Sequence, residues 1–100
     1  MIMTPSSTSV IVSIKKEDIS HLHFPHGEVL VGQEVIEQRK TLLERSVVLG
    51  NTFKGKTRIL FEDSDGMKQI ETHIWGLTDK RLILKHGIVI PIHRIHEVKL

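Results

Sequence analysis

The chain has 100 residues, of which 39% are hydrophobic and 26% charged, and its formal net charge is +2. This length favours a single domain over residues 1–100, and the composition, close to that of an average soluble domain, excludes a chain that is disordered throughout. Cysteine is absent, which excludes disulfides, thiol nucleophiles and thiolate metal sites.

The chain begins with a polar stretch, residues 1–9, that predicts a frayed start. The alternation of Val10, Val12 and Ile14 predicts a short strand, and proline and glycine in 21–27 predict a loop, so 10–32 forms an N-terminal strand-and-loop segment. The apolar run 10–14 is too short for a secretory signal, and no run reaches the roughly 18 apolar residues of a membrane span. We therefore expect a cytoplasmic protein without integral membrane contact.

Residues 33–49 show helical periodicity. The apolar positions are Val35, Ile36, Leu42, Leu43 and Val47. Charged side chains, among them Glu34, Glu37, Arg39, Lys40, Glu44 and Arg45, occupy the opposite face. The pattern predicts one amphipathic helix, which Gly50-Asn51 should end because both residues tolerate the left-handed conformation.

Short β-type runs separated by turn residues fill 56–100. Asp65-Gly66 is a strong hairpin signal, and His86-Gly87 marks a later turn. We predict an α+β fold in which the helix precedes a strongly bent, antiparallel five-stranded sheet or small barrel, with an additional N-terminal strand. The alternation assigns these residues to one core: Ile59, Phe61, Ile70, Thr72, Ile74, Leu82, Leu84, Ile88, Ile90, Ile92, Ile95 and Val98.

Several neighbours of these core positions, expected to face outward, are also apolar: Leu60, Trp75, Ile83 and Val89. A solvated outer face should carry fewer such side chains. Either the N-terminal strand and the helix cover them, or another subunit does. We predict self-association through Trp75, Ile83 and Val89, since a small domain gains stability by pairing.

The order of elements, ending in the segment 90–98, resembles the Sm-like and SH3-like small barrels over roughly Gln33–Leu100. In those folds a hydrophobic strand, a one-turn helical step and a short closing strand recur. The chain also resembles a group of uncharacterised bacterial proteins that share an Asp-Gly hairpin, a strand containing Trp and a final Ile-Pro-Ile step. This resemblance implies a small barrel and no known activity.

Two further comparisons concern the loops. Sm-like RNA binders resemble one another in an acidic residue-plus-asparagine loop and a closing Arg-Gly or Lys-Gly loop, whereas Asp79-Lys80-Arg81 and Lys85-His86-Gly87 lack the asparagine. The segment 77–88 is similar to bacterial pleckstrin-like domains, which have a Thr-Asp-x-Arg turn before a strand and usually close with a C-terminal helix. The residues after 98 leave no room for such a helix.

The chain has seven histidines, and some have the spacing of metal ligands. His21 and His23, with His26 nearby, could join His93 and His96 in one site, with Glu28 or Glu97 as a carboxylate ligand. Such a site requires the N-terminal loop to fold over the C-terminal turn. Exposed or hydrogen-bonded histidines are the commoner explanation, so metal binding stays an alternative and no cofactor is predicted.

His73, with Glu71 and Trp75 on either side, has the residue types of a general base or a ligand platform. No nucleophile is placed beside it by the sequence, and a surface strand residue is the commoner explanation. We therefore predict that the protein is not an enzyme.

A basic rim is the basis of a second alternative, binding of RNA or DNA. Its candidate residues are Lys54, Lys56, Arg58, Lys80, Arg81 and Lys85, with Arg94 nearby. An exposed Trp75 could stack on a base, although packing is the commoner role of a lone tryptophan. The favoured prediction is a non-enzymatic interaction module, self-associating and open to a protein partner, with nucleic-acid and histidine-metal binding as alternatives.

Overall fold

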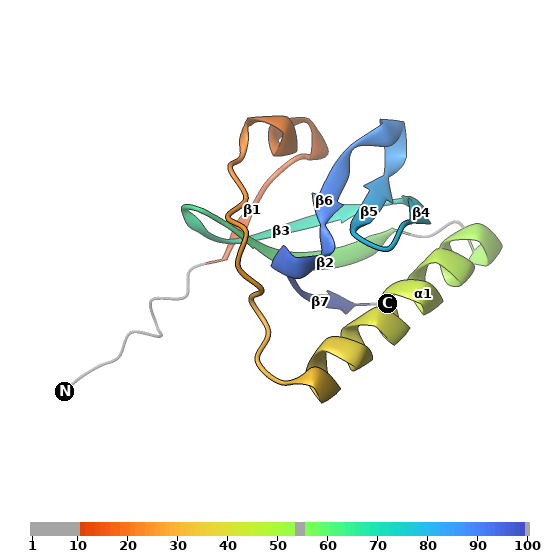
Figure 1. Cartoon of the computed structure of the whole chain (residues 1–100). Helices are drawn as coiled ribbons and strands as arrows, with labels where there is room; N and C mark the ends of the chain where they lie inside the picture. Colours follow the sequence, from red (N-terminus) through yellow and green to blue (C-terminus); the bar gives the residue numbers. More distant parts are fainter. Residues whose placement is uncertain (1–10, 54–55, 100) are drawn as a thin grey trace.

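The computed structural model describes residues 11–53 and 56–99 (Figure 1). One long helix, α1 (Gln33–Phe53), accompanies two β-sheets, so the fold is α+β. The strands are β1 (Val12–Ser13), β2 (Thr57–Asp63), β3 (Gly66–Thr72), β4 (Ile74–Leu77), β5 (Arg81–Leu84), β6 (Val89–Pro91) and β7 (Ile95–Lys99). The described residues also form three short 3-10 helices, η2 (Lys16–His21), η3 (Lys85–Gly87) and η4 (Ile92–Arg94).

The strands form a four-stranded sheet of order β1-β3-β2-β7 and a three-stranded sheet of order β4-β5-β6. Among the described strands, only β1 is parallel to its neighbour, pairing Val12 with Lys68 and Ser13 with Gln69 of β3. The predicted N-terminal strand is therefore present at Val12–Ser13, while Val10 lies outside the described residues.

The prediction of five strands in one sheet or barrel was wrong, because six strands follow α1 and they divide between two sheets. The division falls at His73, between β3 and β4. Before it, Thr72 pairs with Thr57 of β2, and after it, Ile74 pairs with Leu84 of β5. The segment 70–75 thus belongs to two sheets, because its two halves have different hydrogen-bonding partners.

The predicted helix is present but continues to Phe53, through the expected stop at Gly50-Asn51. Glycine permits a left-handed helix end without imposing it, and keeping it helical costs only about 1 kcal/mol. The helix packs against β4 and β7, with Leu43 and Ser46 buried on that side. In the described part of the chain, no helix is long and apolar enough to cross a membrane.

The predicted core is confirmed in nearly every position. Fully or almost fully buried are Ile59, Phe61, Ile70, Thr72, Ile74, Leu82, Leu84, Ile90, Ile95 and Val98. Ile88 and Ile92 are partly buried and pack against this cluster. The sequence pattern missed Ile19, which η2 brings into the core from a segment expected to be irregular.

The segment between η2 and α1 is attached to the sheets by packing and by backbone hydrogen bonds (orange in Figure 1). The ring of Phe24 lies 6.0 Å from that of Phe61. The Ser64 amide donates to the His23 carbonyl at 2.8 Å, and the Val29 amide donates to the His93 carbonyl at 3.0 Å. Residues 22–30 are therefore part of the folded domain.

Candidate functional site

The outer face of the three-stranded sheet carries a row of residues without charge. Gly76 of β4 pairs with Ile83 of β5, which pairs in turn with Val89 of β6. Paired residues of adjacent strands point to the same face, so the backbone register aligns these three positions. The register shifts between Ile74 and Gly76. This irregularity makes Trp75 the extra residue beside the row.

Trp75 and Val89 are exposed on this face, with 57% and 40% of their surface accessible, and Ile83 is half-buried. The imidazole ring of His86 lies 6.1 Å from the Trp75 ring in an edge-on arrangement. The turn between β5 and β6 positions this ring, because His86 and Gly87 both have positive φ angles, 69° and 78°. Two consecutive residues of this kind let the chain reverse direction within the short segment 85–88 that connects β5 to β6.

The predicted cover for this face is not provided within the described part of the chain. The helix packs against β4 and β7, and β1 pairs with β3 in the other sheet. Neither element buries Trp75 or Val89. Two residues farther along β5, on the same face, Arg81 pairs with Pro91, which places a cation at the end of the apolar row.

The residues predicted to form a basic rim do not form one surface. Lys56 and Arg58 line a hollow of about 560 Å³, whereas Lys80 and Arg81 line a separate hollow of about 520 Å³. Lys85 follows β5 in η3 and lines neither hollow. Lys54 lies outside the described residues.

Arg94, also considered for the rim, is buried and has structural partners. Its Nε donates to the Glu62 carbonyl at 3.0 Å, and one terminal nitrogen donates to the Gly27 carbonyl at 2.7 Å. The guanidinium therefore attaches the N-terminal segment to β2. With 7% of its surface accessible, Arg94 does not offer a phosphate contact.

Arg39 was assigned to the solvated face of the helix, and this assignment was wrong. Its guanidinium is 5% exposed and bonds to both carboxylate oxygens of Glu28 and to the Ile95 carbonyl. The signal was present in the sequence, since Arg39 lies three residues after Ile36 and four before Leu43, on their side of the helix. A buried arginine was not expected because its partner comes from an irregular segment.

The pKa of Glu28 reflects this arrangement. Burial raises it, but the hydrogen bonds from Arg39 and from the Leu30 amide, together with the positive charge of Arg39, lower it more, so the pKa lies below its ordinary value of 4.5. The ion pair links α1, the N-terminal segment and β7. It has a structural role, since the terminal nitrogens of Arg39 donate three hydrogen bonds, two to Glu28 and one to the Ile95 carbonyl.

The candidate metal ligands are used in other ways or lie apart. His21 and His23 are exposed. The Nε2 of His93 donates to the Pro25 carbonyl at 3.0 Å, and the Nε2 of His96 lies 2.8 Å from a Glu62 carboxylate oxygen. Within residues 11–53 and 56–99, no group of three or more histidine or acidic side chains is arranged to hold a metal ion.

His73, the candidate general base, is half-buried between β3 and β4 rather than on an open surface. Its carbonyl accepts a hydrogen bond from the Lys85 amide at 3.0 Å. Neighbouring Glu71 lies 3.6 Å from Arg58. His73 thus lies at the connection between the two sheets.

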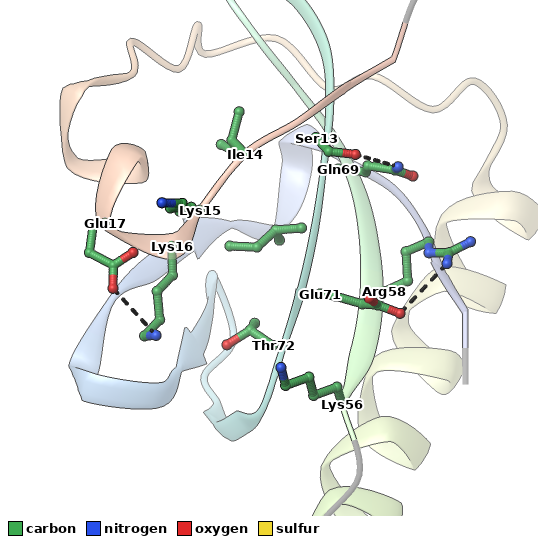
Figure 2. A pocket seen from close by; sticks show the side chains of 11 residues that line it. Ser13, Ile14, Lys15, Lys16, Glu17, Lys56, Arg58, Gln69, Glu71 and Thr72 are labelled. Carbon is green, nitrogen blue, oxygen red and sulfur yellow. Dashed lines mark hydrogen bonds and ion pairs between the residues drawn. The ribbon is translucent and has the colours of Figure 1, made fainter.

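Two lysines that the sequence analysis did not select, Lys15 and Lys16, line the same hollow as Lys56 and Arg58 (Figure 2). They escaped notice because their relation to β2 depends on the pairing of β1 with β3.

Protein-family models, curated proteins and solved structures were all compared with this chain, and none of them matches it.

Proposed function

We propose that the protein is a non-enzymatic interaction module that self-associates through the outer face of its three-stranded sheet. The observation that carries this proposal is the exposed Trp75 beside the aligned row Gly76, Ile83 and Val89. Aromatic side chains with an apolar surround are the usual anchors of protein interfaces. The proposed function keeps the three residues predicted from the sequence, Trp75, Ile83 and Val89.

A second copy of this chain is the partner that this face fits best. A twofold interface requires a self-complementary surface. Trp75 is exposed next to Gly76, which has no side chain. The Trp75 ring of one copy can therefore pack over the Gly76 backbone of the other copy. The face carries little charge, and each copy has a net charge of +2, so attraction between copies must come from apolar contact.

The order of elements supports the resemblance to Sm-like and SH3-like barrels as part of this proposal. The short η4 helix between β6 and β7 corresponds to the expected one-turn step, and β7 pairs with β2 as the closing strand. Small folds of this kind host many functions. The proposal for the function therefore depends on the Trp75 face and not on the resemblance.

Sedimentation of the purified protein at low and high salt tests self-association directly. An oligomer held by apolar contact persists at high salt, because added salt screens charges and leaves apolar burial intact. Trp75→Ser should shift the protein to a monomer. The matched control is Val35→Ser, which removes an exposed apolar side chain from α1. A monomer at every salt and protein concentration would contradict the proposal.

Binding of nucleic acid and of metal are weaker candidates. The cations of the expected rim divide between two hollows, and the four histidines do not form a ligand group in the described part of the chain. A steep fall of oligonucleotide affinity with salt would favour the first alternative. A rise of thermal stability on adding zinc, reversed by a chelator, would favour the second.

A further inference from the structure

A hollow of about 560 Å³ lies between the N-terminal segment and the β2-β3 hairpin (Figure 2). One wall comes from residues 13–17, where β1 leads into η2, and the other from the start of β2 and the second half of β3. Parallel pairing of β1 with β3, extended by the Ile14 amide donating to the Gln69 carbonyl at 3.0 Å, joins the walls. This hollow is separate from the Trp75 face.

Positive charge exceeds negative charge in the lining. The lining contains the cations Lys15, Lys16, Lys56 and Arg58 and the carboxylates Glu17 and Glu71. Each carboxylate already has a partner: Lys16 lies 3.5 Å from Glu17, and Arg58 lies 3.6 Å from Glu71. Among the described residues, the ammonium groups of Lys15 and Lys56 form no ion pair. The four cations and two carboxylates leave an excess of two positive charges in the lining, as many as the net charge of the whole chain.

A hydroxyl group lies between two of these cations. Figure 2 shows the side chains of Lys16 and Lys56 extending from opposite walls, with Thr72 between them. Thr72 is only 5% exposed, and it is one of the residues that line the hollow. A hydroxyl donor flanked by ammonium groups is suited to an anionic oxygen.

We propose that this hollow binds the phosphate group of a small phosphate monoester. Several cations and a hydroxyl around one point match the charge and the acceptor oxygens of a phosphate dianion. The lining includes no aromatic side chain, so the hollow lacks the stacking platform typical of sites for single-stranded nucleic acid. The half-buried side chain of Ile14 provides apolar surface for the organic part of the ligand.

Calorimetric titration of the full chain with glycerol phosphate tests the proposal, with sodium sulfate at equal ionic strength as the comparison. We expect saturable binding of the ester that sulfate does not reproduce. Lys56→Gln should weaken binding about tenfold or more, since it removes a charge-assisted contact. Lys40→Gln, which removes an exposed lysine on α1, should leave the affinity unchanged.

Substitution of Thr72 provides a second test that separates binding from folding. Thr72→Val keeps the shape of the side chain and removes the hydroxyl, so it should weaken binding of the ester, whereas Thr72→Ser should retain it. Both proteins should unfold cooperatively. Equal affinity of the valine and serine variants would contradict the assigned role of the hydroxyl.

Vesicles containing phosphatidic acid distinguish the source of the phosphate group. If the protein binds these vesicles as well as glycerol phosphate, and Lys56→Gln weakens both, the ligand class includes lipid headgroups. If the protein binds glycerol phosphate but not the vesicles, the ligand is a soluble ester. Binding of a single-stranded oligonucleotide without binding of glycerol phosphate would overturn the proposal. So would an equal response to sulfate, or equal losses in Lys56→Gln and Lys40→Gln. Because the hollow is separate from the Trp75 face, the result of this test does not depend on whether the protein self-associates.

Discussion

Both terminal nitrogens of Arg39 lie 2.6 Å from the two carboxylate oxygens of Glu28. One of them also donates to the Ile95 carbonyl at 3.0 Å. This guanidinium therefore joins the helix, the N-terminal segment and β7 at one buried point. Planar, bidentate pairs of this kind require arginine rather than lysine.

Glu28→Gln should lower the free energy of unfolding by about 2 kcal/mol, because a buried guanidinium loses its counter-charge. Urea unfolding at neutral pH measures this change. Glu44→Gln is the matched control, since it removes an exposed carboxylate from α1 and should change the free energy by less than about 0.5 kcal/mol. Equal effects of the two substitutions would mean that the ion pair adds no stability.

The same ion pair should make stability depend on pH in the acid range. The pKa of Glu28 is lowered in the folded protein, so its contribution is complete above the ordinary value of 4.5 and is lost as the pH falls through the folded pKa. The difference in unfolding free energy between the wild type and Glu28→Gln should therefore shrink below that value. A backbone hydrogen bond is the main cause that lowers the pKa of Glu17, but Glu17 is common to both proteins and cancels. A difference that stays constant with pH would contradict this assignment.

Gly87→Ala should destabilise the protein by about 1 kcal/mol. The φ angle of Gly87 is 78°, in the left-handed region, where a Cβ atom is strained. Gly76→Ala is the matched control, because no positive φ is required there and the added Cβ would meet the Ile83 side chain at an ordinary 3.8 Å. Urea unfolding at a protein concentration that favours the monomer compares the two, and equal losses would argue against strain in the turn.

Fluorescence of Trp75 should report on self-association, since the chain has one tryptophan and its side chain is 57% exposed. Quenching by acrylamide should decrease as protein concentration rises, because a second copy covers the ring. Val89→Lys, which places a charge on the proposed interface, should make the quenching independent of concentration. Val35→Lys should behave like the wild type. Quenching that is independent of concentration in all three proteins would contradict the proposed interface.

The burial pattern of the strands could be predicted from sequence because it depends on a local alternation. Ile59 and Phe61 on β2, and Leu82 and Leu84 on β5, are buried as their period of two requires. The residues proposed for self-association were selected in the same way, and in the structure Ile83 pairs with Val89. The Asp65-Gly66 turn between β2 and β3 followed from residue types that act within a few positions.

Other features could not be predicted because they depend on partners distant in the sequence. Arg39 is buried only because Glu28 and the Ile95 carbonyl meet it there. Likewise, Arg94 has a structural role because folding brings the Gly27 and Glu62 carbonyls together. From sequence alone, a charged side chain is expected to be exposed to solvent, because the groups that would pair with it in the folded protein are not yet known.

The sequence by itself determined which residues alternate into the core, that one long helix lies between a short N-terminal strand and the other strands, and that Trp75 is left outside. Those outcomes follow from periodicity and turn chemistry, which are local. Tertiary structure alone decided that the strands divide into two sheets at His73, that the predicted basic rim separates into two hollows, and that Lys15 and Lys16 join Lys56 around Thr72. Hydrogen-bond pairing between distant strands governs each of these, because it sets which surfaces face one another.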